Sequence, residues 1–231
     1  IFNHAIKVKV RGKTRANKQI CSFPPLQLRF NKKDVENSIF KGQKKMKLVA
    51  HCQNDRSYEE YVKREYLIYK LYQHISPYSF NVRLCRITYQ DENKLNQKNI
   101  HYGFLIESIK DVAKRNDMTV FKGKIRNQET LNKESLDKLV FFQFLIGNLD
   151  WSITERHNMK LIIGDKGALP IAVPYDFDYS GYSLLNKHQI SSYGYFTFPE
   201  DKSGKQYLGA MVPLIEENVC ESEGTEDTTG K

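Results

Sequence analysis

The first hundred residues consist of short runs in which apolar and polar positions alternate, the pattern of half-buried β-strands. Such runs occupy residues 5–10, 26–30, 46–50, 81–89 and 101–107. A cationic loop that contains a glycine, residues 11–19, joins the first two runs, and we call it the basic loop. The pattern predicts a strand-rich lobe over residues 1–110.

One long helix is predicted inside this lobe. Ser57 followed by Glu60 has the spacing of a capping box, and apolar residues recur at helical spacing until Pro77. Both apolar stripes that can be drawn on this helix pass through Glu65. A carboxylate on an apolar face needs a partner, and Lys47 in the preceding strand offers one. We therefore expect a Lys47–Glu65 ion pair, with a Glu65 that reaches water at the edge of the stripe as the alternative.

The pattern changes in the second half of the chain. Residues 108–130 are polar and irregular, which predicts a linker. Helical spacing returns from Leu131 with so many apolar residues that the helix should be buried nearly all round, and Gly147 should end it. Two short apolar runs separated by residues 164–167 then predict a hairpin. The second lobe, over residues 111–215, is thus predicted to be helical with one hairpin.

Composition and charge narrow the class of protein. The 231 residues are 40% hydrophobic and 27% charged, as in an ordinary globular protein, and carry a formal net charge of +9. No apolar run approaches the ~20 residues of a membrane span. A basic chain attracts polyanions, but basic and aromatic residues are not interleaved on one face, so a nucleic-acid-binding domain is the less favoured alternative. Residues 216–231 hold six acids and have the composition of a disordered tail.

The four cysteines lack the spacing of a zinc site. Cys85 lies in a predicted strand, where we expect a buried small hydrophobe. Cys21 and Cys52 flank neighbouring strand segments, and whether they form a disulfide stays open. The chain begins at Ile1 without a methionine or a signal peptide, so the removal or omission of an upstream segment stays open, as do a cytoplasmic and an exported location.

Acidic and amide side chains are concentrated where the elements of the second lobe end. Asp150 and Asn158 lie in the loop after the apolar helix, and Asp176 and Asp178 follow the second apolar run. A hairpin would bring these ends together. Mg²⁺ prefers oxygen ligands from carboxylates and amides, so the pattern is compatible with a metal and phosphate site. The alternative is that these side chains only cap helices and form turns.

The candidate residues follow the order of parts in protein kinases. These are a strand lysine, a helix glutamate, the end of a strand, a loop Asp, a loop Asn and an Asp-Phe pair: Lys47, Glu65, Glu107, Asp150, Asn158 and Asp176-Phe177. Phosphoryl transfer needs a cation on the phosphate oxygens, a carboxylate that accepts the proton of the attacking hydroxyl, and oxygen ligands for Mg²⁺.

Several segments of the chain resemble a known family. FLIGNLDWS, the following His157-Asn158 and PYDFDYSG are similar to the catalytic core of atypical kinases of the HipA and CotH type. VRGKTR and KLVAHC resemble the N-terminal lobe of the CotH-like kinases, and the resemblance covers roughly residues 8–181. It implies an α+β, two-lobed protein-kinase-like fold. It also implies transfer of the γ-phosphate of ATP, with Mg²⁺, to a hydroxyl group on a protein.

The resemblance also implies a role for each candidate residue. Asp150 would be the general base, and Asn158 and Asp176 would bind Mg²⁺, with Asp178 as a second ligand or a turn cap. Lys47, oriented by Glu65, would contact the α- and β-phosphates. In addition, phosphate oxygens would be held by Arg11 and Lys13 of the basic loop, and adenine by the backbone near Glu107.

Two departures from the kinase pattern favour an alternative, a pseudokinase or nucleotide-binding scaffold of the same fold. Asn158 follows Asp150 by eight residues, whereas a protein-kinase loop has five, so three residues must bulge out. The second is that the chain has no Gly-x-Gly-x-x-Gly loop. Asp178 stands where a glycine usually follows Asp-Phe, which leaves open whether Asp176 or Asp178 is the main metal ligand, and we favour Asp176 because it directly follows the apolar run. The intact set of lysine, glutamate, aspartates and asparagine favours the active enzyme.

Overall fold

The computed structural model describes most of the first 184 residues. The described ranges are 4–12, 15–90, 93, 98–125 and 127–184. Lys13 of the basic loop lies outside the described residues, as do the predicted acidic tail, residues 216–231, and the part of the second lobe from residue 185 onward.

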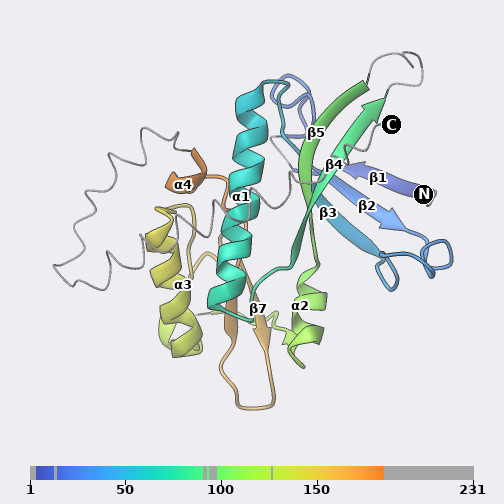
Figure 1. The fold of residues 1–231 in the computed structure, drawn as a ribbon. Coiled ribbons are helices and arrows are strands. Elements are labelled where there is room, and N and C mark those ends of the chain that lie inside the picture. Colours follow the sequence, from blue (N-terminus) through green and yellow to red (C-terminus); the bar gives the residue numbers. More distant parts are fainter. Residues whose placement is uncertain (1–3, 13–14, 91–92, 94–97, 126, 185–231) are drawn as a thin grey trace, which may run out of the picture. The chain divides into compact units, whose positions relative to one another are not determined.

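A five-stranded antiparallel sheet, in the order β1-β2-β3-β5-β4, is built by the first half of the chain (Figure 1). Its strands are Ile6–Val10, Leu26–Phe30, Lys45–Val49, Val82–Gln90 and Lys98–Ile106, numbered β1 to β5. All five predicted strands are confirmed. Lys47 pairs with Gln27 on one side and Ile106 on the other, which places it in the middle of the sheet.

Helix α1, Arg56–Ile75, packs against β4 and β5. Its N-cap is Asp55, whose carboxylate accepts a hydrogen bond from the Ser57 backbone N–H at 2.8 Å, so the predicted capping box starting at Ser57 is wrong. The long apolar stripe is confirmed, because Val62, Ile68, Tyr69 and Tyr72 are buried. Glu65 is buried with them at 4% exposure, and it therefore does not reach water at the edge of the stripe.

The predicted linker, residues 108–130, contains regular structure. Ser108 and Asp111 form a reciprocal capping box that begins helix α2, Ile109–Arg115. Strand β6, Thr119–Val120, and a short 3-10 helix, Gln128–Thr130, follow. The prediction missed α2 because only Val112 and Ala113 are buried in it, too few to produce a periodic pattern.

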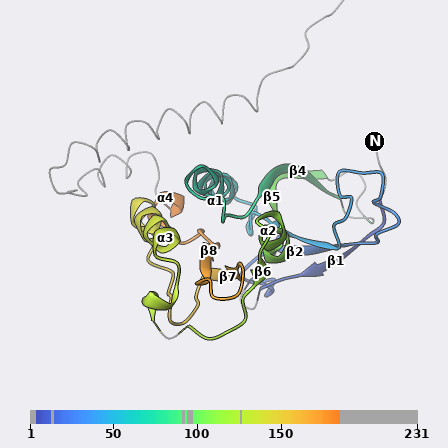
Figure 2. The same ribbon diagram turned by 90° about the horizontal axis from the view of Figure 1, so that it is seen from below.

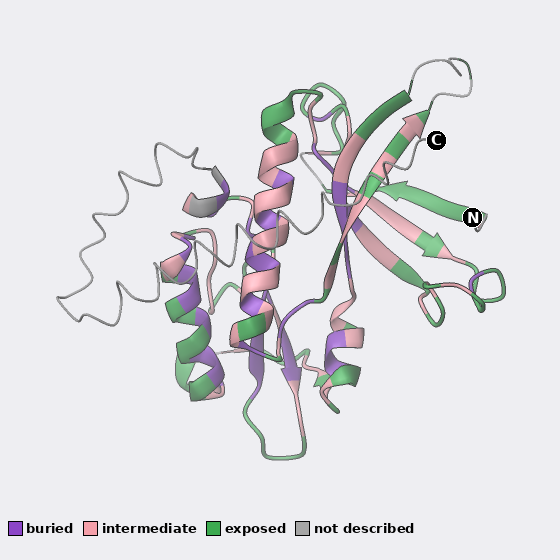
Figure 3. Cartoon of the chain, in the orientation of Figure 1, coloured by how far each residue is buried: buried purple, intermediate pink, exposed green. Residues whose placement is uncertain are grey.

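The second sheet has the order β6-β7-β8, and its β7–β8 hairpin confirms the prediction. The remaining strands are β7 (Met159–Ile163) and β8 (Ile171–Pro174), and the remaining helices are α3 (Lys133–Leu145) and α4 (Gly181–Leu184). Gly147 has a φ of 61° just after α3, as predicted for the residue that ends it. The prediction that α3 is buried nearly all round is wrong: Val140 and Phe141 are 42% and 46% exposed, and Figure 3 shows exposed and buried residues alternating along the helix.

The two halves share a hydrophobic core. The Tyr69 ring of α1 lies 5.6 Å from the Phe104 ring of β5 and 4.8 Å from the Phe177 ring, measured between centroids. Tyr72 contacts Phe142 of α3 in the same way at 4.8 Å, and Figure 2 shows α1 next to α3. Residues 1–184 accordingly form one compact unit of mixed α+β structure, as expected for the fold class. None of the described helices has the length and hydropathy that a transmembrane span requires.

Candidate functional site

A cavity of about 650 Å³ lies where the basic loop, β3, α1, the Asp150 loop and the segment after β8 meet. Seven of the predicted site residues line it: Arg11, Lys47, Glu65, Asp150, Asn158, Asp176 and Asp178. They come from six separate places in the sequence, and only folding brings them together. Glu107 is not among the lining residues.

Lys47 is the central cation of this cavity. Its ammonium group lies 5.1 Å from the centre of the Tyr175 ring, and Lys160 approaches the same ring at 4.9 Å. Burial, together with the neighbouring charges of Arg11 and Lys160, lowers the pKa of Lys47 to about 8, and Asp176 opposes the shift. Such a cluster of partly desolvated cations favours the binding of an anion.

The predicted Lys47–Glu65 ion pair is not formed between these two described residues. The charges that act on the Glu65 carboxyl are those of Asp178, Asp176 and Arg15, and Lys47 is not one of them. Glu65 instead accepts a hydrogen bond from the backbone N–H of Phe177. The apolar stripe of the helix correctly predicted that the Glu65 side chain points inward. It meets the Asp176-Phe177 segment, however, and not β3.

Glu65, Asp176 and Asp178 form what we call the carboxylate cluster. Burial and the charges of Asp178 and Asp176 raise the pKa of Glu65 well above its usual value. Burial and Asp178 likewise raise the pKa of Asp176. The backbone N–H of Asp176, at a φ of 66°, donates to the Tyr69 hydroxyl oxygen at 2.9 Å, which fixes the start of the cluster. A bound cation would reduce the electrostatic repulsion between these carboxylates.

Asp150 and Asn158 are in direct contact despite their unusual spacing. A backbone bridge between Ser152 and His157, with N···O distances of 3.2 and 3.0 Å, closes the intervening residues into a separate turn. The Asn158 side-chain nitrogen then donates to the Asp150 backbone oxygen at 2.7 Å and to Oδ2 at 2.9 Å. Because its nitrogen is used in this way, the Asn158 carbonyl oxygen is the atom that remains for a metal ion.

Two further residues contribute to the site and were not among the predicted site residues. His157 Nε2 lies 2.9 Å from Asp150 Oδ1, and Arg15 forms an ion pair with Asp178. His157 directly precedes Asn158, and Arg15 belongs to the basic loop, so each lay beside a recognised signal. The contact between Arg15 and Asp178 spans 163 positions and has no signature in the spacing of residues.

Glu107 forms bonds that connect neighbouring segments of the fold, and it is not one of the residues that line the cavity. Its carboxylate pairs with Arg115 at 2.6 Å and accepts the backbone N–H of Asn81, also at 2.6 Å. Its own N–H donates to the Asn81 carbonyl at 3.1 Å. These bonds connect the segment between β5 and α2 to the residue before β4, and they occupy the backbone N–H of Glu107 itself, one of the backbone groups in the region that the resemblance assigned to adenine.

Three of the four cysteines lie in the described part of the chain, and two of them form a disulfide. Cys21, just after the basic loop, forms a disulfide with Cys52 in the segment between β3 and α1. Cys85 is a free cysteine and is only half-buried, so the expectation of a buried residue is wrong. Its strand, β4, is an edge strand of the sheet, and burial alternates along it between exposed and intermediate positions.

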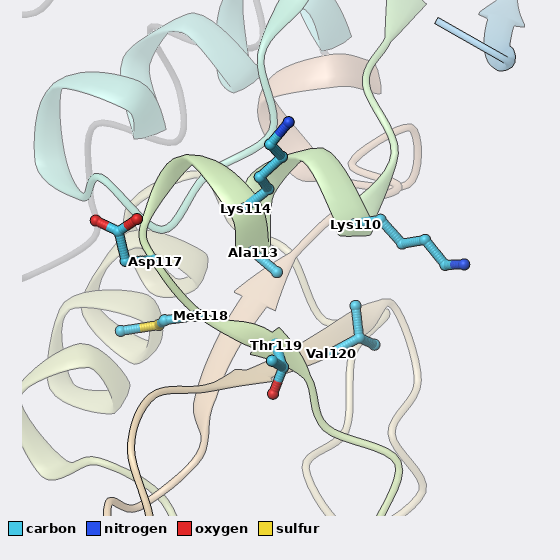
Figure 4. A pocket seen from close by; sticks show the side chains of 7 residues that line it. All are labelled: Lys110, Ala113, Lys114, Asp117, Met118, Thr119 and Val120. Carbon is cyan, nitrogen blue, oxygen red and sulfur yellow. The ribbon is translucent and has the colours of Figure 1, made fainter. Parts of the chain in front are cut away.

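A second hollow of about 460 Å³ lies between α2 and β6 (Figure 4). It is lined by Lys110, Lys114 and Asp117, together with small and apolar side chains. Figure 4 shows that the two lysine side chains point apart. The polar groups of this hollow therefore do not converge on a common point, in contrast to those of the first cavity.

The side chains of the first cavity could hold Mg²⁺ only together with oxygen atoms from a bound ligand or water. No three His, Cys, Asp or Glu side chains in the described part of the chain are placed to hold a metal by themselves. The available donors are two carboxylates, Asp176 and Asp178, and the Asn158 carbonyl oxygen. Mg²⁺ in nucleotide sites is commonly bound by one or two carboxylates together with phosphate oxygens and water, and the raised pKa of Asp176 marks a place where a cation is favourable.

No protein-family model and no curated protein sequence matches the chain.

Proposed function

We propose that this protein is an ATP- and Mg²⁺-dependent phosphotransferase of the atypical protein-kinase type, with a hydroxyl group on a protein as acceptor. The observation that supports the proposal best is the cavity of about 650 Å³, which collects Lys47, Glu65, Asp150, Asn158 and Asp176. A two-lobed kinase-like arrangement, with the five-stranded sheet and α1 as one lobe, is part of the same proposal.

The charges in the cavity suit a nucleotide with its metal ion. Lys47 and Arg11 supply positive charge for phosphate oxygens, and Asp176 supplies negative charge close to both of them. Bound Mg²⁺, held by Asn158, Asp176 and Asp178, would supply the charge neutralisation that the phosphate oxygens need. Burial lowers the pKa of Arg11 and Asp176 opposes the shift, so desolvation of Arg11 favours an anionic ligand in the same way as that of Lys47.

Asp150 is positioned as the general base in this proposal. The acceptor oxygen forms a bond to the γ-phosphorus, the bond from that phosphorus to the bridging oxygen breaks, and ADP leaves with the electron pair. The proton of the acceptor hydroxyl goes to a carboxylate oxygen of Asp150. Asn158 and His157 each hold one oxygen of this carboxylate, at 2.9 Å, and so fix its orientation.

The alternative, a pseudokinase or nucleotide-binding scaffold, is favoured by two observations. Lys47 and Glu65 are not paired, and Arg15 engages Asp178, a proposed metal ligand. The hydrogen bonds between Asp150 and Asn158 favour the active enzyme, because they remove the objection raised by the three additional residues.

Thermal unfolding with Mg-ATP tests both nucleotide hypotheses. At about ten times its Kd, a ligand adds about 1.4 kcal/mol to the stability, which raises the Tm of a chain of this size by roughly 3–6 °C. Asp176→Ala should abolish the shift, and Asp137→Ala, at an exposed position of α3, should keep it. If millimolar Mg-ATP leaves the wild-type Tm unchanged, both the kinase and the scaffold are excluded.

A further inference from the structure

The ion pair between Arg15 and Asp178 places a third cation at the cavity. Their side chains are 35% and 16% exposed. Burial disfavours the charge of Arg15, but the Asp178 carboxylate, followed by Glu65 and Asp176, raises its pKa above the ordinary value. Arg15 is therefore the cation that pairs directly with the carboxylate cluster, while Lys47 and Arg11 also act on Asp176.

The chain around Arg15 is fastened to the wall of the cavity on both sides. On the N-terminal side, the Arg11 backbone N–H donates to the Pro25 carbonyl at 2.8 Å. On the C-terminal side, Cys21 is joined to Cys52 by the disulfide, and the Phe23 N–H donates to the Cys52 carbonyl at 2.8 Å. If the guanidinium releases Asp178, these bonds keep it near the cavity.

A divalent cation and Arg15 would compete for the same carboxylate. In the proposed site Mg²⁺ would take an oxygen of Asp178, and that side chain already has a cationic partner. A guanidinium displaced from a carboxylate is well suited to phosphate, because its planar fork matches two phosphate oxygens as it matches two carboxylate oxygens. Phosphoryl transfer also gains from an arginine that neutralises the charge of the group being transferred.

We propose that Arg15 is a catalytic residue that contacts the transferring phosphoryl group, and that Asp178 holds it in place until a divalent cation takes over that carboxylate. This inference rests on the proposed function. It adds an exchange of partners: Arg15 moves from carboxylate to phosphate as the metal binds. The Cys21–Cys52 disulfide then acts as the anchor that limits this movement.

The exchange predicts changes of opposite sign in two measurements on Arg15→Ala. Binding of Mn²⁺ alone, followed by electron paramagnetic resonance without nucleotide, should become about threefold tighter or more, since a competing ion pair is removed. Phosphoryl transfer from Mg-ATP should fall at least about 10²-fold, as when one preorganised donor to the reacting group is lost. Arg29→Ala, an exposed arginine on β2, is the matched control and should change neither quantity.

A structural role for Arg15 would give a different result. Mn²⁺ affinity that is unchanged or weaker in Arg15→Ala overturns the exchange, and unchanged transfer overturns contact with the phosphoryl group. If wild type binds no Mn²⁺ and transfers no phosphate, the proposed function fails together with the inference. Wild-type activity with an unresponsive Arg15→Ala refutes the inference alone.

Two further variants cover the case in which Arg15→Ala does not fold. Arg15→Lys keeps the charge but loses the fork, so Mn²⁺ affinity should stay near the wild-type value while transfer falls. The double variant Cys21→Ser/Cys52→Ser should lower transfer with Mn²⁺ affinity unchanged, because the ion pair is kept and its anchor is lost. Full transfer in Arg15→Lys or in the double variant contradicts the proposal.

Discussion

Lys47 should be the most reactive lysine of the described chain toward an acylating reagent at pH 8. Its pKa of about 8 means that about half of its amino groups are neutral at this pH. An ordinary lysine, with a pKa near 10.4, is about 0.4% neutral, a difference of more than 100-fold. A weaker base is also a weaker nucleophile, by roughly 15-fold over this range, which leaves an advantage of about tenfold.

The assay is partial acetylation followed by peptide mass spectrometry, with Lys133 as the reference because its side chain is 86% exposed. Mg-ATP should protect Lys47, since phosphate oxygens both cover the amino group and favour its charged form. Protection should leave Lys133 unaffected. If Lys47 is acetylated no faster than Lys133, or equally fast with Mg-ATP, the cavity is not the cationic nucleotide site described above.

The same shift has a consequence for stability. The folded-state pKa of Lys47 lies below its unfolded value, so between about pH 8 and the ordinary value of 10.5 the unfolded chain binds more protons. The contribution of Lys47 to the free energy of unfolding should therefore rise with pH across this window and be lost as the pH falls through 8. Lys47→Met should remove this part of the pH dependence in denaturant titrations, and an unchanged slope would contradict the assignment.

Two substitutions elsewhere test the packing of the site. Glu65→Gln should raise the Tm at pH 7.5 by roughly 2–8 °C, because it replaces a buried carboxyl, whose charged form burial and the charges of Asp178 and Asp176 disfavour, at about 1–2 kcal/mol. A lower Tm, or an equal rise in the control Glu60→Gln, would contradict it. Gly103→Ala should destabilise by about 1–3 kcal/mol in urea unfolding, since its Cβ would lie 2.6 Å from the Val49 carbonyl oxygen. Gly164→Ala, whose nearest neighbour would be 3.9 Å away, should be tolerated, and an equal loss in both glycine variants would refute the packing argument.

The strands, α1 and the β7–β8 hairpin could be predicted because their buried positions repeat with a regular period. Helix α2 was missed because it has no such repeat: only Val112 and Ala113 are buried in it. Helix α3 has more apolar residues than are buried in the core, so the sequence pattern did not show which face of the helix is exposed. The local sequence pattern therefore predicts that a helix or strand exists more reliably than it predicts which residues surround it.

The candidate site shows the same limit. The order of motifs identified Lys47, Asp150 and Asp176, because each stands at the end or centre of a recognisable element. The partner of Glu65 could not be predicted, since a helix stripe shows that a side chain points inward without showing which segment it meets. The partner of Arg15 depends on how the basic loop folds back across the cavity, which residue spacing does not encode.

The hydrogen bonds between Asp150 and Asn158 show how an unusual spacing is accommodated. A separate turn, closed by the Ser152–His157 bridge, takes up the additional residues and leaves the side chains of Asp150 and Asn158 in contact. The spacing of a motif in sequence is thus a weaker constraint than the contact it has to form. This contact makes Asp150 the residue on which the proposed chemistry depends most.

The most direct test of the proposed function is a transfer assay with labelled ATP, run on wild type and Asp150→Asn. We expect wild type, and not the variant, to incorporate label from the γ-position, while both keep the Tm shift with Mg-ATP. Equally low incorporation in the two proteins, with binding retained, would contradict catalysis and leave a nucleotide-binding scaffold. Incorporation from the α-position instead would contradict phosphoryl transfer and indicate nucleotidyl transfer.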